Sequence, residues 1–460
     1  MSDIEHSAIE RRLQAGPVVV VGFGVSGEAA VRLLLHVAED AEVRVNDGRP
    51  REAFDGEIVA HFEGQGVRFF FGGHTDAVFE GAGTVVLSPG VPSLEAVERA
   101  RSAGAEVIGE IELALRYVRG PVVAVTGTNG KSTVVGLLSA MAWAARLPHF
   151  LGGNFGIPLS EGVRAMADVG GEGLYILELS SFQLETVRGL GAKVAAILNI
   201  TEDHADRYED FAAYGAAKAR IFAKADRCVV PASDPVVNGF IDAGAAAGAA
   251  GVHRFGAGGE VFAEGDELVD ATSGQRIART SLRLVGAHNA LNACAAMLIA
   301  RLAGLSETAI AQGIADFEGL PHRMALVGDV KGVAFIDDSK ATNVGAAVAS
   351  IRSLGGRPFV LIAGGRDKDG DLSELREAAS NARAVVLLGE AAARFADALS
   401  GAVPLKRVDS LEAAVTGAFE LAEAGDAVLL APACSSYDMF DSYVQRGEAF
   451  ADAVRALEAL

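Results

Sequence analysis

The sequence predicts an α/β protein with three domains, on three observations. Short apolar runs alternate with amphipathic segments along almost the whole chain, as parallel strands joined by crossover helices do. The 460 residues are enough for two or three domains of ordinary size. The 55 glycines and only 13 prolines suit many tight turns between strands and helices.

Composition narrows the class of protein. The formal charge of −20 argues against a nucleic-acid or anionic-membrane partner, because like charges repel. The three cysteines, Cys228, Cys294 and Cys434, lack metal-ligand spacing and suit a reducing compartment. The N-terminus carries charges where a signal peptide needs an apolar run, and no stretch approaches about 18 apolar residues. We expect a cytoplasmic protein without a membrane span.

The elements fall into three blocks, at residues 1–109, 110–319 and 320–460. The first block has predicted strands at 17–21, 42–46, 85–88 and 106–108 and a helix at 26–36. The second has strands at 121–126, 174–177 and 194–200, a helix from residue 131, an irregular β region at 255–284, and helices at 289–303 and 307–317. The third has strands at 333–336, 359–363, 384–388 and 427–430, each followed by a helix.

The first motif is Gly22-Phe-Gly24-Val-Ser-Gly27, between a predicted strand and a predicted helix. Such glycines let the backbone approach a phosphate, and the helix N-terminus favours its charge. Asp47 lies 20 residues beyond Gly27, where a carboxylate can accept hydrogen bonds from a ribose. The glycines could also serve only a tight turn, and the pattern alone would suggest a dehydrogenase. Its context favours a nucleotide at a Rossmann-like domain.

The second motif, Thr-Gly-Thr-Asn-Gly-Lys-Ser-Thr at 126–133, also stands between a strand and a helix. Backbone N–H groups of such a P-loop bind phosphates, the lysine reaches their outer oxygens, and the serine hydroxyl can ligate Mg²⁺. Val125 occupies the place of the first glycine of the standard P-loop, which puts a generic NTPase in doubt. The motif indicates phosphate binding.

Two further runs follow predicted strands, at 178–185 (Glu-Leu-Ser-Ser-Phe-Gln-Leu-Glu) and 199–208 (Asn-Ile-Thr-Glu-Asp-His-Ala-Asp-Arg-Tyr). Parallel sheets place ligand-binding groups at the carboxyl ends of strands. Glu178 could hold the Mg²⁺ that the P-loop hydroxyl touches, and the serine and glutamine after it could equally cap a helix. His204 could be an ordinary loop histidine, and Lys218 by default a solvated helix lysine.

Five further runs carry basic and hydroxyl groups. Together they place these groups at one rim of the predicted third domain or at its junction with the second. A cap, a turn or a surface ion pair would account for each run taken alone. The runs are 289–292, 320–323, 337–343, 364–368 and 434–437.

Taken in order, these runs resemble the Mur ligases from Gly22 to Tyr443. The run at 126–133 is the most family-wide, and those at 178–185, 201–208 and 338–343 resemble the member that adds D-glutamate. The resemblance implies three domains: a Rossmann-like domain for UDP, a central P-loop domain for ATP and a Rossmann-like C-terminal domain. It implies an ADP-forming ligase of peptidoglycan precursor synthesis, whose substrates are UDP-N-acetylmuramoyl-L-alanine and D-glutamate and whose intermediate is an acyl phosphate.

The resemblance also implies the roles of single residues. Binding of the muramoyl substrate would involve Val25, Ser26, Asp47, Ser88, Gly90, Asn154, Ser180 and Gln183. ATP would be held by Gly127, Thr128, Asn129, Gly130, Lys131, Ser132, Thr133, Asn289, Asn292, Arg323 and Asp338. The D-glutamate carboxylates would meet Lys340, Thr342, Lys368 and Ser436, with Tyr443 nearby.

The implied catalytic residues are Lys131, His204 and Lys218. One Mg²⁺ would be ligated by Ser132 and Glu178 and a second by His204 and carbamylated Lys218. The role of carbamylated Lys218 rests on the resemblance alone. We also expect a monomer.

Other interpretations stay open. A sibling ligase for a different amino acid, or a folylpolyglutamate synthase, would share the phosphate loop. A nicotinamide dehydrogenase would explain the first motif but leave the second unused. A nucleotide-gated regulatory module would need no array of lysines suited to an amino-acid dianion.

Overall fold

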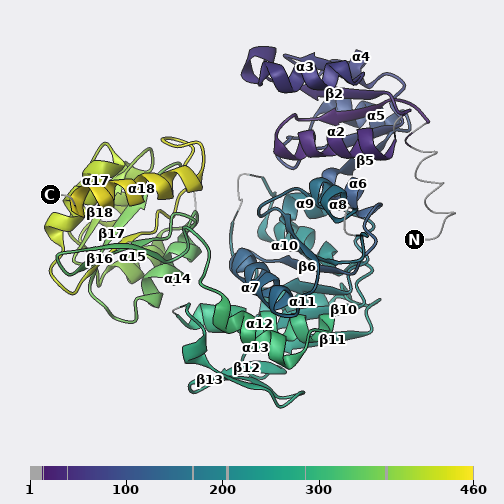
Figure 1. The fold of residues 1–460 in the computed structure, drawn as a ribbon. Helices are drawn as coiled ribbons and strands as arrows, with labels where there is room; N and C mark the ends of the chain where they lie inside the picture. The colour runs from purple at the N-terminus through teal and green to yellow at the C-terminus, as the bar shows by residue number, and fades with distance from the viewer. Residues whose placement is uncertain are drawn as a thin grey trace.

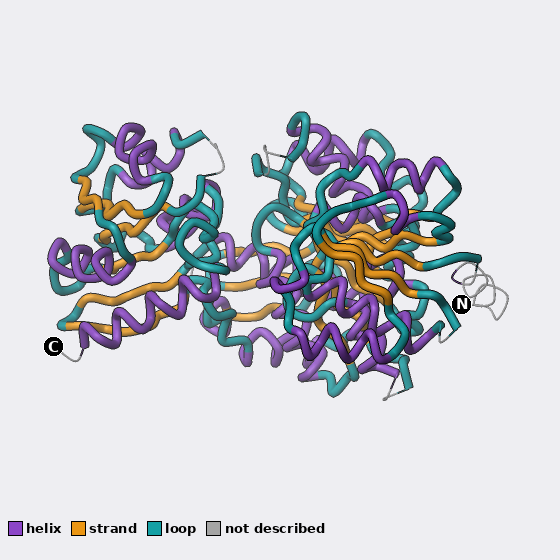
Figure 2. Tube along the Cα trace, turned by 90° about the horizontal axis from the view of Figure 1, so that it is seen from above, coloured by secondary structure: helices purple, strands orange, loops and turns teal. Residues whose placement is uncertain are grey.

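The computed structural model describes residues 13, 15–38, 40–167, 170–203, 207–284, 286–367 and 371–458. It confirms the α/β class, because three sheets with flanking helices follow one another along the chain (Figure 1). Figure 2 shows the C-terminal strands and helices as a lobe beside the larger remainder of the molecule. No helix within the described ranges is long and apolar enough to cross a membrane. The domain boundaries after residues 109 and 319 stay predictions.

The first sheet occupies residues 18–109. Its elements are β1 (Val18–Val21), α2 (Val25–Val37), β2 (Val43–Asp47), η1 (Arg51–Ala53), α3 (Gly56–Gly64), β3 (Arg68–Phe71), α4 (Asp76–Phe79), β4 (Thr84–Leu87), α5 (Glu95–Ser102) and β5 (Glu106–Gly109). The strand order is β3-β2-β1-β4-β5, and every neighbouring pair is parallel. Both faces are covered, with Val18 and Val20 in one buried cluster and Val19 and Val21 in another. This is why β1 is an unbroken run of valines.

The second sheet has nine strands, in the order β14-β13-β12-β11-β10-β9-β6-β8-β7. The region predicted to be irregular is an antiparallel extension of this sheet, from β12 to β14. The elements are α6 (Glu110–Leu115), β6 (Val122–Thr126), α7 (Lys131–Ala144), β7 (His149–Gly153), α8 (Leu159–Ala167), β8 (Leu174–Glu178), α9 (Ser181–Thr186), β9 (Val194–Ile197), α10 (Phe211–Ala219), η2 (Arg220–Phe222), β10 (Arg227–Pro231), α11 (Pro235–Asp242), β11 (Gly251–Phe255), β12 (Val261–Glu264), β13 (Glu267–Asp270), β14 (Arg276–Ala278), η3 (Arg279–Ser281), α12 (Ala287–Ala303) and α13 (Glu307–Asp316).

The third sheet has the order β15-β16-β20-β17-β18-β19, and β15 runs antiparallel to β16 while the other neighbours are parallel. Its elements are β15 (Ala325–Val330), β16 (Val333–Asp337), α14 (Val344–Ser353), β17 (Phe359–Gly364), α15 (Ser373–Ala379), β18 (Ala384–Leu388), α16 (Ala392–Leu399), β19 (Leu405–Arg407), α17 (Leu411–Leu421), β20 (Ala427–Leu430) and α18 (Tyr443–Glu458).

The first two sheets are joined by a common apolar core. A single buried cluster contains Val18 of β1, Leu34 of α2, Ile111 of α6, Leu159 of α8 and Ala124 of β6. The third sheet has two buried clusters of its own. The apolar packing therefore continues across the first join, whereas the third domain is built around separate cores.

A buried acid lies at the first join. Glu110, the first residue of α6, accepts a hydrogen bond from the backbone N–H of Ser160 in α8 at 2.6 Å. Its other oxygen, Oε2, has no hydrogen-bond partner. Burial raises the pKa of Glu110 to about 7.

Glu110→Gln should stabilise the protein at pH 8. The acid has its ordinary pKa of 4.5 when unfolded and about 7 when folded, so the stability it contributes is present below pH 4.5 and is lost as the pH rises through 7. At pH 8 the free energy of unfolding of the variant should exceed that of the wild type by on the order of 3 kcal/mol. At pH 5 this gain in stability should be much smaller. Urea unfolding followed by circular dichroism at both pH values measures this difference.

Glu112→Gln on the same helix is the contrasting control. The Glu112 carboxylate accepts hydrogen bonds from the backbone N–H groups of Arg188 (2.8 Å) and Gly189 (2.9 Å), so this change should lower stability at both pH values. A gain for Glu110→Gln that is equal at pH 5 and pH 8 would contradict the assignment of the raised pKa.

Candidate active site

The loop between β6 and α7 has the strand–loop–helix context predicted for a phosphate loop. Gly127 and Gly130 have φ angles of 154° and 82°, which favour glycine. A Cβ at Gly130 would also lie 2.4 Å from Asn292 Oδ1 of α12. Helix α7 begins at Lys131, so the N–H groups of its first turn, which an α-helix does not pair internally, lie at the loop. This geometry suits an anionic ligand.

A buried carboxylate lies beside this loop. Glu178, the last residue of β8, is 2% exposed. It accepts hydrogen bonds from Ser132 Oγ (2.5 Å) and Asn154 Nδ2 (2.7 Å). Burial acts to raise the pKa of Glu178, but the charge of Lys131 and these two hydrogen bonds outweigh burial, and the pKa is lowered. The carboxylate is therefore held in its charged form.

The Glu178 carboxylate and the Ser132 hydroxyl fit a magnesium ion. Mg²⁺ prefers oxygen ligands and commonly binds one or two carboxylates together with substrate phosphates and water. Within the described ranges, no group of three or more His, Cys, Asp or Glu side chains could hold a metal ion. His204, predicted at a second metal, lies outside the described residues.

Two lysines point at the phosphate loop from different helices. Lys131 Nζ donates to Gly127 O (2.8 Å) and Thr128 O (2.7 Å). Lys218 Nζ, from α10, donates to Gly127 O at 2.9 Å. Lys218 is 2% exposed, and burial and then the charge of Lys131 hold its pKa well below the ordinary value. Lys218 is thus no solvated helix lysine, and its protonated form is less favoured than that of an exposed lysine.

The run after β9 is attached to the phosphate loop by paired hydrogen bonds. The backbone N–H of Asn129 donates to Asn199 Oδ1 (2.9 Å), and Asn199 Nδ2 donates to Asn129 O (3.0 Å). The backbone N–H of Thr201 donates to Thr128 Oγ1 (3.0 Å), whose hydroxyl donates to Thr201 O (3.1 Å). The two loops therefore keep one relative position.

The third domain contacts the central domain at these loops. Arg323 Nη2 donates to Ser132 Oγ at 2.6 Å, and Asn343 Nδ2 donates to Asp203 Oδ2 at 3.2 Å. The neighbouring Asp338 is buried, and burial raises its pKa to about 6. These contacts place the third domain against the phosphate loop.

A pocket of about 440 Å³ joins the central and third domains. Buried Asn289 and Asn292 of α12 lie in its wall. The predicted residues that line it are Thr128, Asn129, Gly130, Lys131, Thr133, Asn154, Glu178, Ser180, Lys218, Asn289, Asn292, Arg323, Asp338, Lys340 and Thr342.

The third-domain loops are organised by a residue that sequence reasoning missed, Arg446 of α18. Its guanidinium donates from Nη2 to Ser339 O (2.8 Å) and from Nη1 to Cys434 O (3.2 Å), although the side chain is buried. It thereby joins the loops of Lys340 and Ser436. Nothing local distinguishes this arginine from a solvated one, because its partners are carbonyl oxygens of distant segments.

Two predicted D-glutamate residues are close together. Lys340 Nζ lies 4.0 Å from the ring centroid of Tyr443. Ser436 is buried, and neither it nor Tyr443 is among the residues that line the pocket. Lys368 lies outside the described residues.

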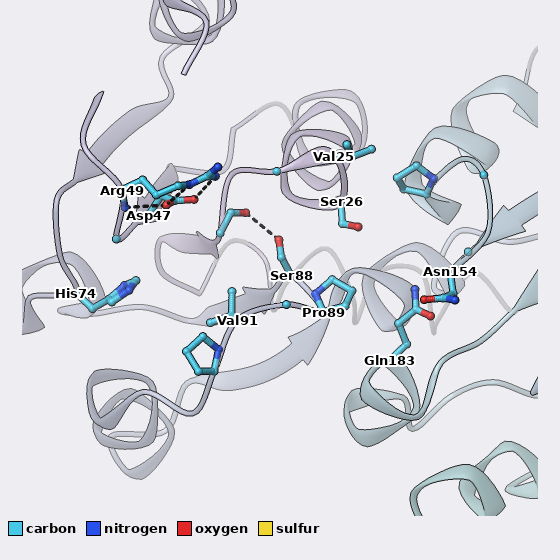
Figure 3. Close-up of a pocket in the computed structure, with 18 residues that line it drawn as sticks. Val25, Ser26, Asp47, Arg49, His74, Ser88, Pro89, Val91, Asn154 and Gln183 are labelled. Carbon is cyan, nitrogen blue, oxygen red and sulfur yellow. Dashed lines mark hydrogen bonds and ion pairs between the residues drawn. The ribbon is translucent and has the colours of Figure 1, made fainter. Parts of the chain in front are cut away.

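A second pocket, of about 680 Å³, lies at the carboxyl ends of the strands of the first sheet (Figure 3). Ser88 Oγ donates to Gly22 O at 2.8 Å and so joins the loops after β1 and β4. Asn154 lines this pocket as well as the first, so the two pockets meet there. The predicted residues that line it are Val25, Ser26, Asp47, Ser88, Gly90, Asn154 and Gln183.

The Asp47 carboxylate accepts four hydrogen bonds from the protein. They come from the N–H of Phe23 (2.7 Å) and from the N–H, Nε and Nη2 of Arg49 (2.9, 3.0 and 2.9 Å). Burial opposes ionisation, but these donors outweigh it and lower the pKa of Asp47 to about 2. The predicted contact of Asp47 with a nucleotide stays a prediction. In the structure, Asp47 orients Arg49 and the loop at Phe23.

The capping interpretation of the run at 178–185 is confirmed, and the Mg²⁺ contact of Glu178 stays a prediction. Ser180 and Gln183 form a capping box at the start of α9, with the N–H of Gln183 donating to Ser180 Oγ (3.2 Å) and the N–H of Ser180 donating to Gln183 Oε1 (3.0 Å). The same two residues line different pockets, Ser180 the phosphate-loop pocket and Gln183 the second. The cap therefore fixes residues on both sides of the junction.

Comparison with solved structures shows a shared fold at low sequence identity. MurF from Acinetobacter baumannii is 17% identical, with a TM-score of 0.65 and 98% of each chain covered. The UDP-N-acetylmuramate-alanine ligase MurC from Thermotoga maritima is 16% identical, with a TM-score of 0.61, covering 96% of this chain and 99% of its own. Folylpolyglutamate synthase from Mycobacterium tuberculosis is 18% identical, with a TM-score of 0.57, covering 75% of this chain and 92% of its own.

Sequence comparison gives nearer relatives. A UDP-N-acetylmuramoylalanine–D-glutamate ligase from Methylobacillus flagellatus is 42% identical, covering 97% of this chain and 98% of the relative. A ligase of the same name from Chromobacterium violaceum is 41% identical, and the match covers 96% of this chain and 98% of the relative. Family models match residues 16–109 (Mur ligase MurD-like, N-terminal domain), 125–300 (Mur ligase middle domain) and 322–434 (Mur ligase, glutamate ligase domain). The chain therefore belongs to the Mur ligase family.

Proposed function

We propose that this chain is an ATP-dependent, ADP-forming ligase that joins D-glutamate to UDP-N-acetylmuramoyl-L-alanine in peptidoglycan precursor synthesis. The observation that carries the proposal is the meeting of the two pockets at Asn154. A substrate with its UDP end in the first domain would present its other end to the phosphate loop. The relatives at 41–42% identity carry the name of this ligase.

The reaction forms an amide from a carboxylate and an amine. ATP first transfers its γ-phosphoryl group to the alanine carboxylate, and the amine of D-glutamate then attacks the acyl phosphate and displaces phosphate. Lys131 and Arg323 place positive charge where the two anions meet, which offsets their repulsion. Ser132 and Glu178 would hold a Mg²⁺ that neutralises phosphate charge further. The protein mainly aligns the reactants.

We also propose that Lys218 is carbamylated and, with His204, holds a second Mg²⁺. A neutral amine adds CO₂ and releases a proton, and burial beside Lys131 favours that neutral amine. The product is an anion next to the Lys131 ammonium, which stabilises it. The modification would thus replace an amine, whose protonation Lys131 disfavours, by an anion that forms an ion pair with Lys131.

The D-glutamate site is proposed in the third domain, with Lys340, Thr342, Ser436, Tyr443 and Lys368. Two lysines suit an amino acid with two carboxylates. We propose further that the enzyme is a cytoplasmic monomer with the three domains given by the sequence. Family membership leaves a dehydrogenase and a regulatory module without support. A folylpolyglutamate synthase would leave the pocket of the first domain unexplained.

The substrate assignment predicts turnover with one amino acid. Phosphate release from ATP is measured with UDP-N-acetylmuramoyl-L-alanine and, in parallel, D-glutamate, L-glutamate, L-lysine or diaminopimelate. Release should require D-glutamate, and Lys340→Ala should raise the KM for D-glutamate because a cationic contact to its carboxylate is lost. Turnover with another amino acid would assign the chain to a sibling ligase, and no turnover with any would refute the proposed substrates.

The carbamate predicts a specific rescue. Lys218→Ala should lower kcat by about 100-fold or more, since a charged group at the reacting phosphates is removed. Formate or acetate at high concentration should restore part of the activity by supplying a carboxylate in the same space. Exposed Lys224 gives a matched control, and Lys224→Ala should leave kcat unchanged. Full activity of Lys218→Ala would count against the carbamate.

A further inference from the structure

Arg446, near the start of α18, is a buried cation without a carboxylate in contact. The residue is 3% exposed. Burial lowers the pKa of Arg446 to about 10, so the guanidinium stays charged at neutral pH. Within the described ranges no carboxylate forms an ion pair with it, and Asp337 and Asp438 act on it only at longer range. A buried charge of this kind is costly for stability, which points to a role in the neighbouring site.

The guanidinium of Arg446 donates hydrogen bonds to two loops at once. Nη2 and Nε donate to Ser339 O (2.8 Å) and Ser339 Oγ (2.9 Å), in the loop after β16. Nη1 donates to Ser435 O (3.3 Å), in the loop after β20. Ser339 directly precedes Lys340, and Ser435 directly precedes Ser436. One rigid, planar group therefore sets the distance between the loops of two proposed D-glutamate contacts.

Two further contacts extend this arrangement. Ser339 Oγ, the acceptor of Arg446 Nε, donates to Tyr443 O at 2.8 Å. Ser435 and Arg366 exchange backbone hydrogen bonds of 3.1 and 2.9 Å, which attaches the loop after β17. The strands β16, β20 and β17 are neighbours in the third sheet. The loops at three adjacent strand ends are thus held in one arrangement around the guanidinium.

Gly365 leaves the space that this arrangement needs. Its φ angle is 131°, which favours glycine. A Cβ at this position would lie 2.4 Å from Ser435 O and 3.2 Å from Arg446 Nη1. A side chain would therefore push the loop after β17 away from the guanidinium, whereas glycine lets the two approach.

We propose that Arg446 is a positioning residue that sets the length of the amino acid accepted by the third domain. The inference rests on the proposed function and goes beyond it by naming what separates glutamate from aspartate. These two amino acids carry the same charged groups and differ by one methylene group, so charge alone does not distinguish them. A fixed distance between the loops of Lys340 and Ser436 does, because both carboxylates reach their donors together only at one chain length.

Arg446→Lys tests the proposal in the full chain. The ammonium group keeps the charge but cannot bridge both loops with the fixed geometry of a guanidinium. The KM for D-glutamate should rise by about three- to tenfold. The inhibition constant of D-aspartate against D-glutamate should change much less, because D-aspartate does not use the native spacing. The kcat and the KM values for ATP and for the muramoyl substrate should stay as in the wild type, all measured by phosphate release.

A second variant keeps the buried guanidinium. Ser339→Ala removes only the hydroxyl between Arg446 and Tyr443, and it should raise the KM for D-glutamate by a smaller factor. The double variant should raise this KM by less than the product of the two single effects, because both changes break the same link. Arg455→Lys is the matched control on the same helix. Arg455 is exposed and pairs with Asp452, so this change should leave every constant unchanged.

An arginine with only a structural role would give another pattern. The constants for D-glutamate and D-aspartate would then rise by the same factor, or the KM values for all three substrates would rise together, and either result would overturn the inference. An unchanged KM for D-glutamate in both Arg446→Lys and Ser339→Ala would also overturn it. Absence of turnover with D-glutamate in the wild type would refute the proposed function itself, and this result is seen before any variant is made.

Discussion

The catalytic arrangement depends on one charge, the buried carboxylate of Glu178. A charge removed from water is costly unless partners compensate it. The partners here come from separate parts of the chain: Ser132 and Lys131 from the start of α7, Asn154 from the end of β7, and Arg323 from the third domain. Compensating this one carboxylate therefore joins the phosphate loop, the junction of the pockets and the third domain in one place.

Parallel topology explains why these partners meet. The strands β6, β8 and β9 are neighbours in one sheet, and the phosphate loop, Glu178 and the loop of Asn199 follow their carboxyl ends. The same rule places the pocket of the first domain after β1, β2 and β4. The carboxyl ends of the strands, where open parallel sheets bind ligands, thus face a common junction in both sheets. The third domain completes the site through side chains that reach across, not through its own sheet alone.

The fold class, most buried strands and the phosphate loop could be predicted from sequence, because continuous apolar runs and glycine spacing are local signals. The strand β19 lacks such a run, and β3 is a short, partly exposed strand with an apolar run of only three phenylalanines. The strands β12 to β14 are also short and partly exposed, so their pairing depends on distant neighbours. The site residues that were missed have the same cause. Arg446 binds carbonyl groups of remote loops. Lys218 was placed by resemblance, and its low pKa follows only from tertiary burial.

The continuous apolar core between the first two sheets has a consequence for how such enzymes diversify. Replacing the first domain by that of another protein would separate packed side chains such as Ile111 and Leu159. The cavities left in the core would lower the stability of the protein. The third domain has cores of its own and meets the phosphate loop through a few polar contacts, among them that of Arg323. It is therefore the exchangeable module. On the proposed assignment of D-glutamate to this domain, a lineage can change the amino acid it selects by inheriting or remodelling this module while the machinery that activates the carboxylate stays whole.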